Sequence, residues 1–247
     1  MTDRERIDKL MVRRQLAGSR ERARALIMAG RVLVDERPVD KAGTQIDSEA
    51  TIRLKGEDIP YVSRGGLKLA RALEVFQVTV AGRVALDVGA STGGFTDCLL
   101  QNGARKVFAV DVGYGQLAWK LRDDQRVVNL ERTNIRHLAD DQLDETPHLA
   151  VIDASFISLA KVLPATLAHL QPASDIIALI KPQFEVGKGQ VGKGGVVRDP
   201  EQHLQVIENI KLIADTSGCQ VVSTCESPIL GPKGNREFLI HLRTGRL

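Results

Sequence analysis

Charged side chains stand where several apolar runs of the chain end. Asp87 closes VALD, Asp111 closes VFAVD, Asp153 closes LAVID, and Lys181 follows the unbroken run 176–180. Such runs are typical of strands buried in a parallel sheet, and ligands bind beyond the carboxyl ends of these strands. The four side chains therefore predict one site at that edge. If the strands that end at Asp153 and Lys181 are neighbours, the carboxylate and the ammonium meet there.

The stretch LDVGASTGGFTD, residues 86–97, is typical of a turn that binds a nucleotide. Gly89 makes the tight turn after the strand, and Gly93 and Gly94 open the next helix, where glycines let a ligand approach the backbone. Asp111 lies 22 residues beyond Gly89, where an acid hydrogen-bonds a ribose diol in nucleotide-type sites. We therefore expect an adenosine-containing cofactor. The spacing differs from the G-x-G-x-x-G of dinucleotide sites, which disfavours a nicotinamide oxidoreductase.

A further carboxylate stands in the last apolar run, REFLIHL. Glu237 shares one face of the expected strand with Leu239 and His241. Burying a carboxylate without a partner is costly, so we expect a cation beside Glu237. His241 is expected to be a satisfied or exposed side chain rather than a catalyst. Lys68 lies on a predicted helix just after a glycine pair, and its position alone indicates little.

An alternating series of strands and helices from residue 66 onward must position these groups. Apolar runs predict strands at 83–88, 106–111, 126–130, 149–153, 175–181, 219–226 and 237–243. Helical periodicity predicts helices at 66–76, 94–102, 115–122, 158–170 and 200–217. Because the strands are apolar on both faces, the sheet must be covered on both sides. The predicted class is α/β, a Rossmann-like, mostly parallel sheet with helices on each face.

A separate small α+β unit is predicted before residue 59. Two helices, at 4–17 and from Arg20 to about Gly30 with Ser19 as N-cap, precede short strand-like pieces. Residues 1–31 hold nine Lys/Arg against four Asp/Glu. This basic face suggests contacts to phosphates, although an ordinary solvated helix face has the same pattern. The prediction is a domain at 1–58, a hinge at 59–65 and a second domain at 66–247.

The composition is that of an ordinary soluble globular protein, with 247 residues, 43% hydrophobic, 26% charged and net charge +3. Aromatic residues make up only 4%, so base stacking is not expected to be the main binding mode. Cys98, Cys219 and Cys225 are interpreted as reduced core thiols. Because the chain shows no signal region and no apolar run near the ~18 residues of a span, we expect a cytoplasmic protein without a membrane role.

Five motifs together resemble one known family. SRGGLKL, DVGASTGGFTDCLL, VIDASFISL, LIKPQFE and REFLIHL are similar to the TlyA/haemolysin A family, which is related to FtsJ-type ribose 2′-O-methyltransferases. RIDKLMVRRQLAGSRERARALIMAGRVLVD resembles the αL RNA-binding motif of a ribosomal protein. The resemblance implies a sheet whose last strand is antiparallel. It also implies a catalytic set of Lys68, Asp153, Lys181 and Glu237.

The resemblance further implies S-adenosylmethionine as cofactor and ribosomal RNA or ribosomal subunits as partners. It implies neither a metal nor a required protein partner. The implied cofactor-binding residues are Asp87, Gly89, Ser91, Thr92, Gly93, Gly94, Phe95, Thr96, Asp111 and Asn134. The expected RNA-binding residues are Arg4, Arg6, Arg13, Arg14, Ser19, Arg20, Arg22, Lys41, Arg64, Lys188 and Lys193. The target would be a cytidine ribose in the small subunit, the large subunit or both.

The mechanism implied is attack of a ribose 2′-hydroxyl on an activated methyl group, for which the protein positions the hydroxyl and removes its proton. Lys181 acts as base if its amine is neutral; if it stays charged, it polarises the hydroxyl and water takes the proton. The glycine- and lysine-rich run after Pro182 either closes over RNA backbone or is an ordinary surface loop. A non-catalytic RNA-binding protein and a membrane-active haemolysin remain the alternatives.

Overall fold

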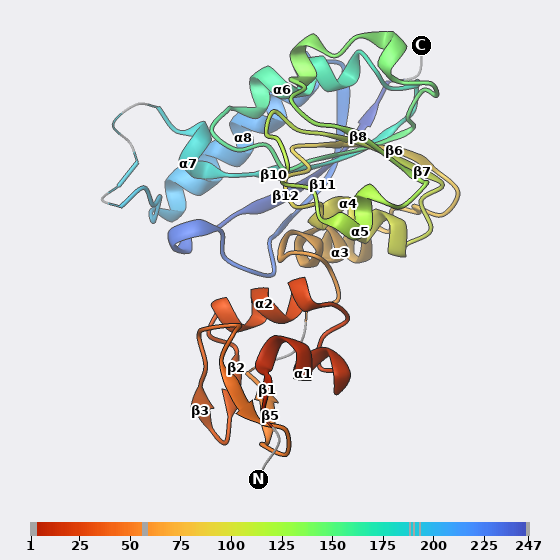
Figure 1. The fold of residues 1–247 in the computed structure, drawn as a ribbon. Coiled ribbons are helices and arrows are strands. Elements are labelled where there is room, and N and C mark those ends of the chain that lie inside the picture. The colour runs from red at the N-terminus through yellow and green to blue at the C-terminus, as the bar shows by residue number, and fades with distance from the viewer. Residues whose placement is uncertain (1–3, 56–58, 188, 190, 193, 246–247) are drawn as a thin grey trace. The chain divides into compact units, whose positions relative to one another are not determined.

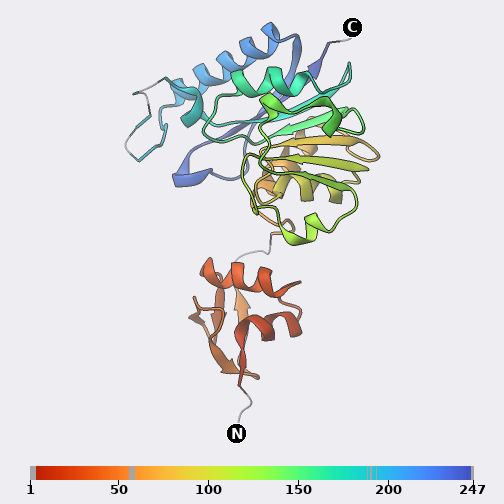
Figure 2. The same ribbon diagram turned by 45° about the horizontal axis from the view of Figure 1, so that its top comes forward.

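The computed structural model describes residues 4–55, 59–187, 189, 191–192 and 194–245 and divides the chain into two compact units, Met1–Asp58 and Ile59–Leu247. Lys188 and Lys193, expected to contact RNA, lie outside the described residues. Figures 1 and 2 show the two units as ribbons. The division follows the apolar clusters of the structure, one of which lies wholly within the first unit and two within the second.

The first unit packs two helices against short antiparallel strands. Its elements are β1 (Arg4–Arg6), α1 (Ile7–Arg13), α2 (Arg20–Met28), β2 (Val32–Val34), β3 (Arg37–Pro38), β4 (Gln45–Asp47) and β5 (Ile52–Leu54). They form the sheets β1-β4 and β3-β2-β5. Ile7, Leu10 and Met11 lie on the buried stripe of α1 and are fully buried with Leu26 and Ile27 of α2.

The predicted first helix is too long at both ends. Arg4–Arg6 is a strand rather than a helical turn, because its backbone pairs with Gln45–Asp47, a strand that the sequence reading did not predict. The helix ends at Arg13, since Gln15 takes a left-handed φ of 60°. The predicted cap of the second helix is confirmed: the Ser19 side chain accepts a hydrogen bond from the Arg22 amide at 3.1 Å.

The second unit contains a seven-stranded sheet in the order β11-β12-β10-β9-β6-β7-β8. The strands are β6 (Val84–Val88), β7 (Lys106–Val110), β8 (Val127–Leu130), β9 (Leu149–Ile152), β10 (Asp175–Ile180), β11 (Cys219–Glu226) and β12 (Phe238–Thr244). Neighbours from β10 to β8 are parallel, whereas β12 is antiparallel to both β10 and β11. The predicted α/β class, with its mostly parallel sheet and antiparallel last strand, is confirmed.

Helices cover both faces of this sheet, as Figures 1 and 2 show. They are α3 (Gly65–Phe76), α4 (Gly94–Gln101), α5 (Trp119–Arg122), α6 (Leu159–Leu167), α7 (Pro182–Glu185) and α8 (Pro200–Thr216), with short 3₁₀ turns η1 (Ile135–His137), η2 (Asp140–Gln142) and η3 (Pro232–Gly234). Strand residues alternate between the layers: Leu86 packs in the core under α6 and α8, and Ala85 packs in the core under α3 and α4.

One predicted helix of this unit is mostly absent. Residues 115–118 are loop and only Trp119–Arg122 is helical, because Gly115 takes a left-handed φ of 71° and Ala118 is extended at ψ 139°. All three cysteines are free, with Cys98 and Cys219 buried and Cys225 half-buried, as predicted. His241 is buried: its Nε2 lies 2.9 Å from Asp175 and its ring stacks on Phe76, whereas its Nδ1 has no hydrogen-bond partner among the described residues. None of the helices described is both long and apolar enough to cross a membrane.

A buried carboxylate ties the first unit together. Asp8 is fully buried on α1, and its two oxygens accept hydrogen bonds from Arg6 at 3.0 and 2.9 Å and from Arg20 at 3.1 Å. The hydrogen bonds of the Arg6 guanidinium, aided by Arg20, hold the pKa of Asp8 well below its usual range although burial opposes this. The carboxylate therefore links β1, α1 and α2.

Replacing Asp8 by asparagine should destabilise this unit by about 1–3 kcal/mol, because charged hydrogen bonds are lost from a buried group. Folding lowers the pKa of Asp8. The carboxylate therefore contributes its full stabilisation at pH values above its unfolded pKa of about 3.9, and this stabilisation is lost as the pH falls through the lower pKa of the folded state. Amide hydrogen exchange of α1 and α2 between pH 7 and pH 2 measures both effects, because the loss begins below the unfolded pKa. Equal stability of wild type and Asp8→Asn across this range would contradict the account.

Candidate active site

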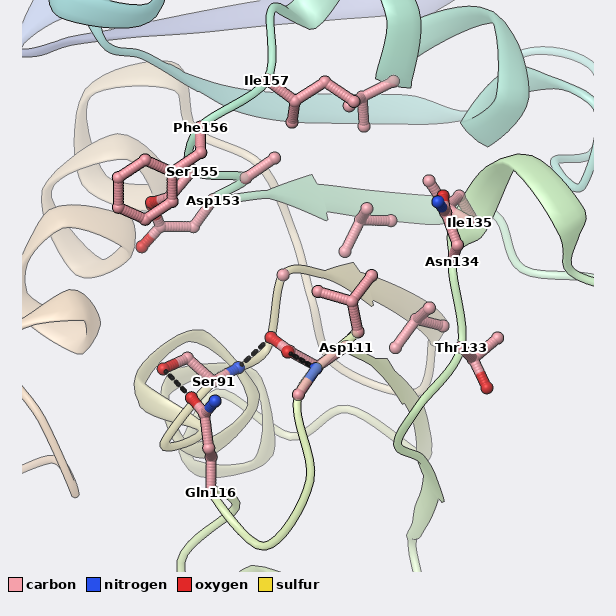
Figure 3. A pocket seen from close by; sticks show the side chains of 17 residues that line it. Ser91, Asp111, Gln116, Thr133, Asn134, Ile135, Asp153, Ser155, Phe156 and Ile157 are labelled. Carbon is pink, nitrogen blue, oxygen red and sulfur yellow. Dashed lines mark hydrogen bonds between the residues drawn. The ribbon is translucent and has the colours of Figure 1, made fainter.

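A cavity of about 520 Å³ opens at the carboxyl ends of the central strands of the second unit. Its walls come from the ends of β6, β7 and β9 and from the segment before η1, and Figure 3 shows their side chains around the opening. The lining residues include Gly89, Ser91, Asp111, Val112, Gly113, Gln116, Thr133, Asn134, Ile135, Asp153, Ser155, Phe156 and Ile157. The cavity therefore lies at the strand edge that the sequence pattern indicates.

Asp111, directly after β7, organises one wall of this cavity. Its Oδ2 accepts a hydrogen bond from the Ser91 amide at 2.8 Å, and its Oδ1 accepts one from the Gly113 amide at 2.6 Å. The Ser91 hydroxyl in turn donates to the Gln116 amide oxygen at 3.2 Å, as the dashed lines in Figure 3 mark. The carboxylate is thus fixed between two loops, with lone pairs left to accept from a diol.

Gly89 is required by a close approach of two strand ends. Its φ is 87°, and a Cβ at this position would stand 2.8 Å from the Asp153 carbonyl oxygen, which is backbone and has no freedom to move aside. The tight turn after β6 therefore brings the cavity floor against the end of β9. A larger residue would push these two walls apart.

Asp87 supports this turn from below rather than lining the cavity. It is fully buried on β6, and the Thr96 hydroxyl donates a hydrogen bond to its Oδ2 at 2.6 Å. The pKa of Asp87 is raised to about 7, mainly by burial and to a smaller extent by the nearby carboxylate of Asp153, while the hydrogen bond from Thr96 opposes the shift. The pair joins the end of β6 to α4, so Asp87 and Thr96 hold the loop from which Gly89 and Ser91 reach the cavity.

Only some of the predicted cofactor-binding residues line the first cavity. Gly89, Ser91, Asp111 and Asn134 line the cavity, whereas Asp87, Thr92, Gly93, Gly94, Phe95 and Thr96 are not among its lining residues. A Cβ on Gly93 would stand 2.2 Å from Leu121, and one on Gly94 would stand 2.3 Å from the Ser63 hydroxyl. These two glycines are therefore explained by helix packing, independently of any ligand.

A second cavity, of about 490 Å³, brings together Lys68, Asp153, Lys181 and Glu237. Lys181, next after β10, lies 2.5 Å from Asp153 Oδ1, and its Nζ also donates to the Ser155 hydroxyl at 2.7 Å and to the Asp153 carbonyl at 3.3 Å. β9 and β10 are parallel neighbours, so the predicted meeting of carboxylate and ammonium at this edge is confirmed.

The expected cation beside Glu237 is Lys68. The Lys68 Nζ, in the first turns of α3, donates to Glu237 Oε2 at 2.5 Å, and both side chains are buried. Glu237 stands just before β12, whose antiparallel direction places its beginning beside the end of β10. The two lysine–carboxylate pairs therefore reach one cavity from four different elements.

The two cavities share Asp153, Ser155 and Phe156 in their walls. Phe156 is 90% exposed and takes a left-handed φ of 64°, a conformation that is strained for an aromatic residue. Its ring lies 5.1 Å from that of Phe184, centre to centre. Ser155 and Phe156 were not among the predicted site residues; the only signal for them was their place directly after the strand end at Asp153.

Several expected RNA-binding arginines are engaged within their own unit. Arg6 and Arg20 bind Asp8, Arg13 pairs with Glu5, and Arg14 donates to the carbonyls of Ala50 and Ser48. Four others of the set are exposed, namely Arg4, Ser19, Lys41 and Arg64, although Ser19 caps α2 and Arg64 donates to the Leu230 carbonyl. Arg22 is half-buried. In the part of the chain that the structure describes, no group of three or more His, Cys, Asp or Glu is arranged to hold a metal ion.

Known proteins match both units. A family model described as FtsJ-like methyltransferase matches residues 61–244, and one described as an S4 domain matches residues 5–52. The chain belongs to the FtsJ-like methyltransferase family. Its first unit is an S4 domain, and the resemblance seen in the sequence motifs is confirmed.

Individual relatives of this FtsJ-like chain are similar over nearly their whole length. The 16S/23S rRNA (cytidine-2′-O)-methyltransferase TlyA of Mycobacterium tuberculosis is 50% identical over 245 residues, which are 99% of this chain and 91% of that one. YqxC of Bacillus subtilis, which carries a putative rRNA methyltransferase name, is 51% identical over 239 residues. The match covers 96% of this chain and 85% of the YqxC chain. A solved structure from Streptococcus thermophilus that carries a hemolysin name is 45% identical, with a TM-score of 0.78 over 99% of this chain and 90% of that one.

The close approach at Gly89 yields a test of the first cavity. Gly89→Ala should weaken S-adenosylmethionine binding at least tenfold, because the added methyl group meets the Asp153 carbonyl and displaces the cavity floor. Isothermal titration of the folded variant measures this.

Gly82→Ala is the matched control. Gly82 is also left-handed, at φ 74°, but a Cβ there meets nothing within 4 Å. It should lose only about 1–2 kcal/mol of stability from backbone strain and should keep its cofactor affinity. Unchanged affinity in Gly89→Ala, or an equal loss in both variants, would contradict this role of the turn.

Proposed function

We propose that the protein transfers a methyl group from S-adenosylmethionine to the 2′-hydroxyl of a cytidine ribose in ribosomal RNA. The observation that carries this proposal is the meeting of two cavities at Asp153 and Phe156, one built for a nucleoside and the other holding two lysine–carboxylate pairs. Membership of the FtsJ-like family supports methyl transfer. The TlyA relative, named as a cytidine-2′-O rRNA methyltransferase, supports the choice of substrate.

The first cavity fits S-adenosylmethionine. Asp111 would bind the ribose diol, and Val112, Asn134 and Ile135 would surround the adenine. The glycine turn at Gly89 packs directly on the Asp153 backbone, which fixes the floor of the cavity under the rest of the molecule. When bound, this cofactor supplies an electrophilic methyl group, so the protein's own residues mainly position the accepting hydroxyl and handle its proton.

Lys181 is the residue that would hold the accepting hydroxyl. Its Nζ has three oxygen neighbours, from the Asp153 carboxylate, the Asp153 carbonyl and the Ser155 hydroxyl. Three acceptors around one nitrogen suit an ammonium, which has three donors. Of the two mechanisms that the sequence leaves open, the carboxylate 2.5 Å away favours a charged Lys181. The substrate hydroxyl would take the place of the Ser155 hydroxyl as one of its three acceptors and be polarised there, with water taking the proton. Its attachment to the end of β10 gives the nitrogen a fixed position.

The Lys68–Glu237 pair would form the opposite wall of the reaction site. The pair is buried, and a Cβ on Gly231 would stand 2.0 Å from Glu237 Oε1, so the glycine lets the backbone pack directly on the carboxylate. A buried pair with good geometry resists rearrangement because separating its charges in a low-dielectric site is costly. Lys68 and Glu237 therefore keep the cavity in shape and place a second ammonium near the substrate.

The S4 domain would supply affinity for ribosomal RNA. Its exposed basic residues suit backbone contacts and recognition by shape, whereas the arginines bound to Asp8 and to backbone carbonyls keep the domain folded. Ribosomal RNA as substrate implies that the protein acts in the cytoplasm. The hemolysin name belongs to the Streptococcus thermophilus relative and is not evidence for this chain. If this protein, once purified, caused leakage of liposomes, that result would favour a membrane role instead.

Lys181→Ala should lower methyl transfer by roughly 10²–10⁴-fold, the range for loss of a positioned proton-handling group. The assay is transfer of labelled methyl from S-adenosylmethionine to 30S, 50S and 70S particles that lack the mark. Lys211→Ala removes a lysine that pairs with Glu208 on α8 and is the matched control, expected to act as wild type. Full activity of Lys181→Ala with the cofactor bound would sink the assignment, and no transfer by wild type to any particle would favour a non-catalytic RNA-binding protein.

Phe156→Ala should raise the KM for the ribosomal particle by an amount that corresponds to about 1–3 kcal/mol, because an exposed ring at the cavity junction is placed to stack on a base. Phe156→Trp keeps an aromatic face and should retain most of the affinity. Steady-state kinetics with saturating cofactor measure both. An unchanged KM in the alanine variant would show that the exposed ring does not contact RNA.

A further inference from the structure

The turn between β11 and β12 places a lysine on the wall of the substrate cavity. Lys233 lies at the centre of η3, takes a left-handed φ of 59° and lines the cavity that holds the two lysine–carboxylate pairs. Its Nζ stands 3.5 Å from the position that a Cβ on Gly195 would take, so the ammonium lies against the glycine-rich segment after α7. This segment and the turn thus form one wall from two distant parts of the sequence.

A buried asparagine joins these two segments. The side chain of Asn235 is 2% exposed; its Oδ1 accepts a hydrogen bond from the Val197 amide at 3.1 Å, and its Nδ2 donates to the carbonyls of Gly195 and Pro232 at 3.0 and 3.1 Å. The Val197 carbonyl accepts from the His203 ring at 2.9 Å, which anchors the segment to α8. Every polar atom of the Asn235 side chain is therefore used to hold the turn and the glycine segment together.

Among the described residues that line this cavity, the charges leave one cation available. Lys68 is matched by Glu237 and Lys181 by Asp153, so these four groups are neutral overall. Among the described residues that line the cavity, Lys233 is the remaining charged side chain, and no ion pair joins it to a described carboxylate. A left-handed lysine held on a cavity wall without a counter-charge is suited to an anionic ligand.

The substrate chemistry brings such an anion with it. A ribose 2′-hydroxyl lies on the carbon next to the one that carries the 3′-phosphodiester of the same nucleotide. Any RNA strand that presents this hydroxyl to Lys181 therefore carries a phosphate to the cavity wall. Lysine binds phosphate as a compact point charge, and such contacts fix the register of the backbone without reading the base.

We propose that Lys233 binds the backbone phosphate beside the target ribose, and that Asn235 is the positioning residue that holds Lys233 on the cavity wall. This inference rests on the proposed function, since it takes an RNA strand as the occupant of the second cavity. It assigns the β11–β12 turn to RNA binding at the reaction site, in addition to the RNA binding proposed for the S4 domain. Lys233 then selects the strand position at which the hydroxyl meets Lys181.

The test is the salt dependence of binding between the protein and a ribosomal particle, measured without methyl transfer. Loss of one phosphate contact should reduce the slope of log affinity against log salt concentration by about 0.7–0.9 in Lys233→Ala. Lys233→Arg should restore the wild-type slope, and Lys211→Ala should leave it unchanged. A wild-type slope in Lys233→Ala would overturn the proposal.

Kinetics separate a phosphate contact from a part in the chemical step. Lys233→Ala should raise the KM for the particle several-fold at physiological salt and leave kcat and cofactor affinity nearly unchanged. A large fall in kcat with an unchanged KM would overturn the proposal, because it would place Lys233 at the reacting atoms. The salt dependence of binding is measured without turnover. An inactive wild-type protein would therefore contradict the methyltransferase function, whereas the salt slope would still test the phosphate contact independently.

The part played by Asn235 is tested by a double-mutant cycle. Asn235→Asp keeps the acceptor for the Val197 amide and loses the two donations, so it should reproduce the reduced slope of Lys233→Ala with normal cofactor affinity. The double variant should show the same slope as Lys233→Ala alone, because both changes remove one contact. A wild-type slope in Asn235→Asp, or additive slope losses in the double variant, would contradict its positioning role.

Discussion

The site depends on one ion pair, between Lys181 at the end of β10 and Asp153 at the end of β9. Two charges are removed from water there, which is unfavourable unless their geometry is good and other oxygens complete the contacts. The parallel register that pairs Ala178 with Ile152 brings the two strand ends together, and Ser155 supplies a further acceptor. Because both partners follow directly on rigid strands, the ammonium has a defined position at the edge where the two cavities meet.

The antiparallel last strand extends this arrangement. In a wholly parallel sheet, the residue before a strand lies at the edge opposite the ligand. β12 runs the other way, with Phe238 opposite Ile180, so Glu237 enters at the ligand edge and reaches Lys68 of α3. The same reversal brings the turn with Lys233 and Asn235 to this edge. One change of strand direction thus supplies two of the five charged side chains that line the described part of the substrate cavity, Glu237 and Lys233.

Much of this was predictable from the sequence because buried strands are unbroken apolar runs, and the charges that end them mark the ligand edge. Asp111, Asp153 and Lys181 were found in this way, and a cation beside Glu237 was expected because its strand is so apolar. The pattern could not identify Lys68 as that cation, since the pairing joins a helix to a strand 169 residues away. Nor could it show that Arg6 and Arg20 share Asp8, that Arg4–Arg6 is a strand, or that Phe156 takes a left-handed conformation, because each follows from tertiary contacts.

The central claim is that the paired cavities deliver a methyl group to a ribose hydroxyl rather than to a base. The most direct measurement is nucleoside mass spectrometry of ribosomal RNA after reaction of the purified protein with isotopically labelled S-adenosylmethionine and unmodified particles. The account predicts labelled 2′-O-methylcytidine, with the label on the sugar fragment. Label on a base, or no labelled nucleoside from any particle while the protein binds both cofactor and RNA, would contradict it.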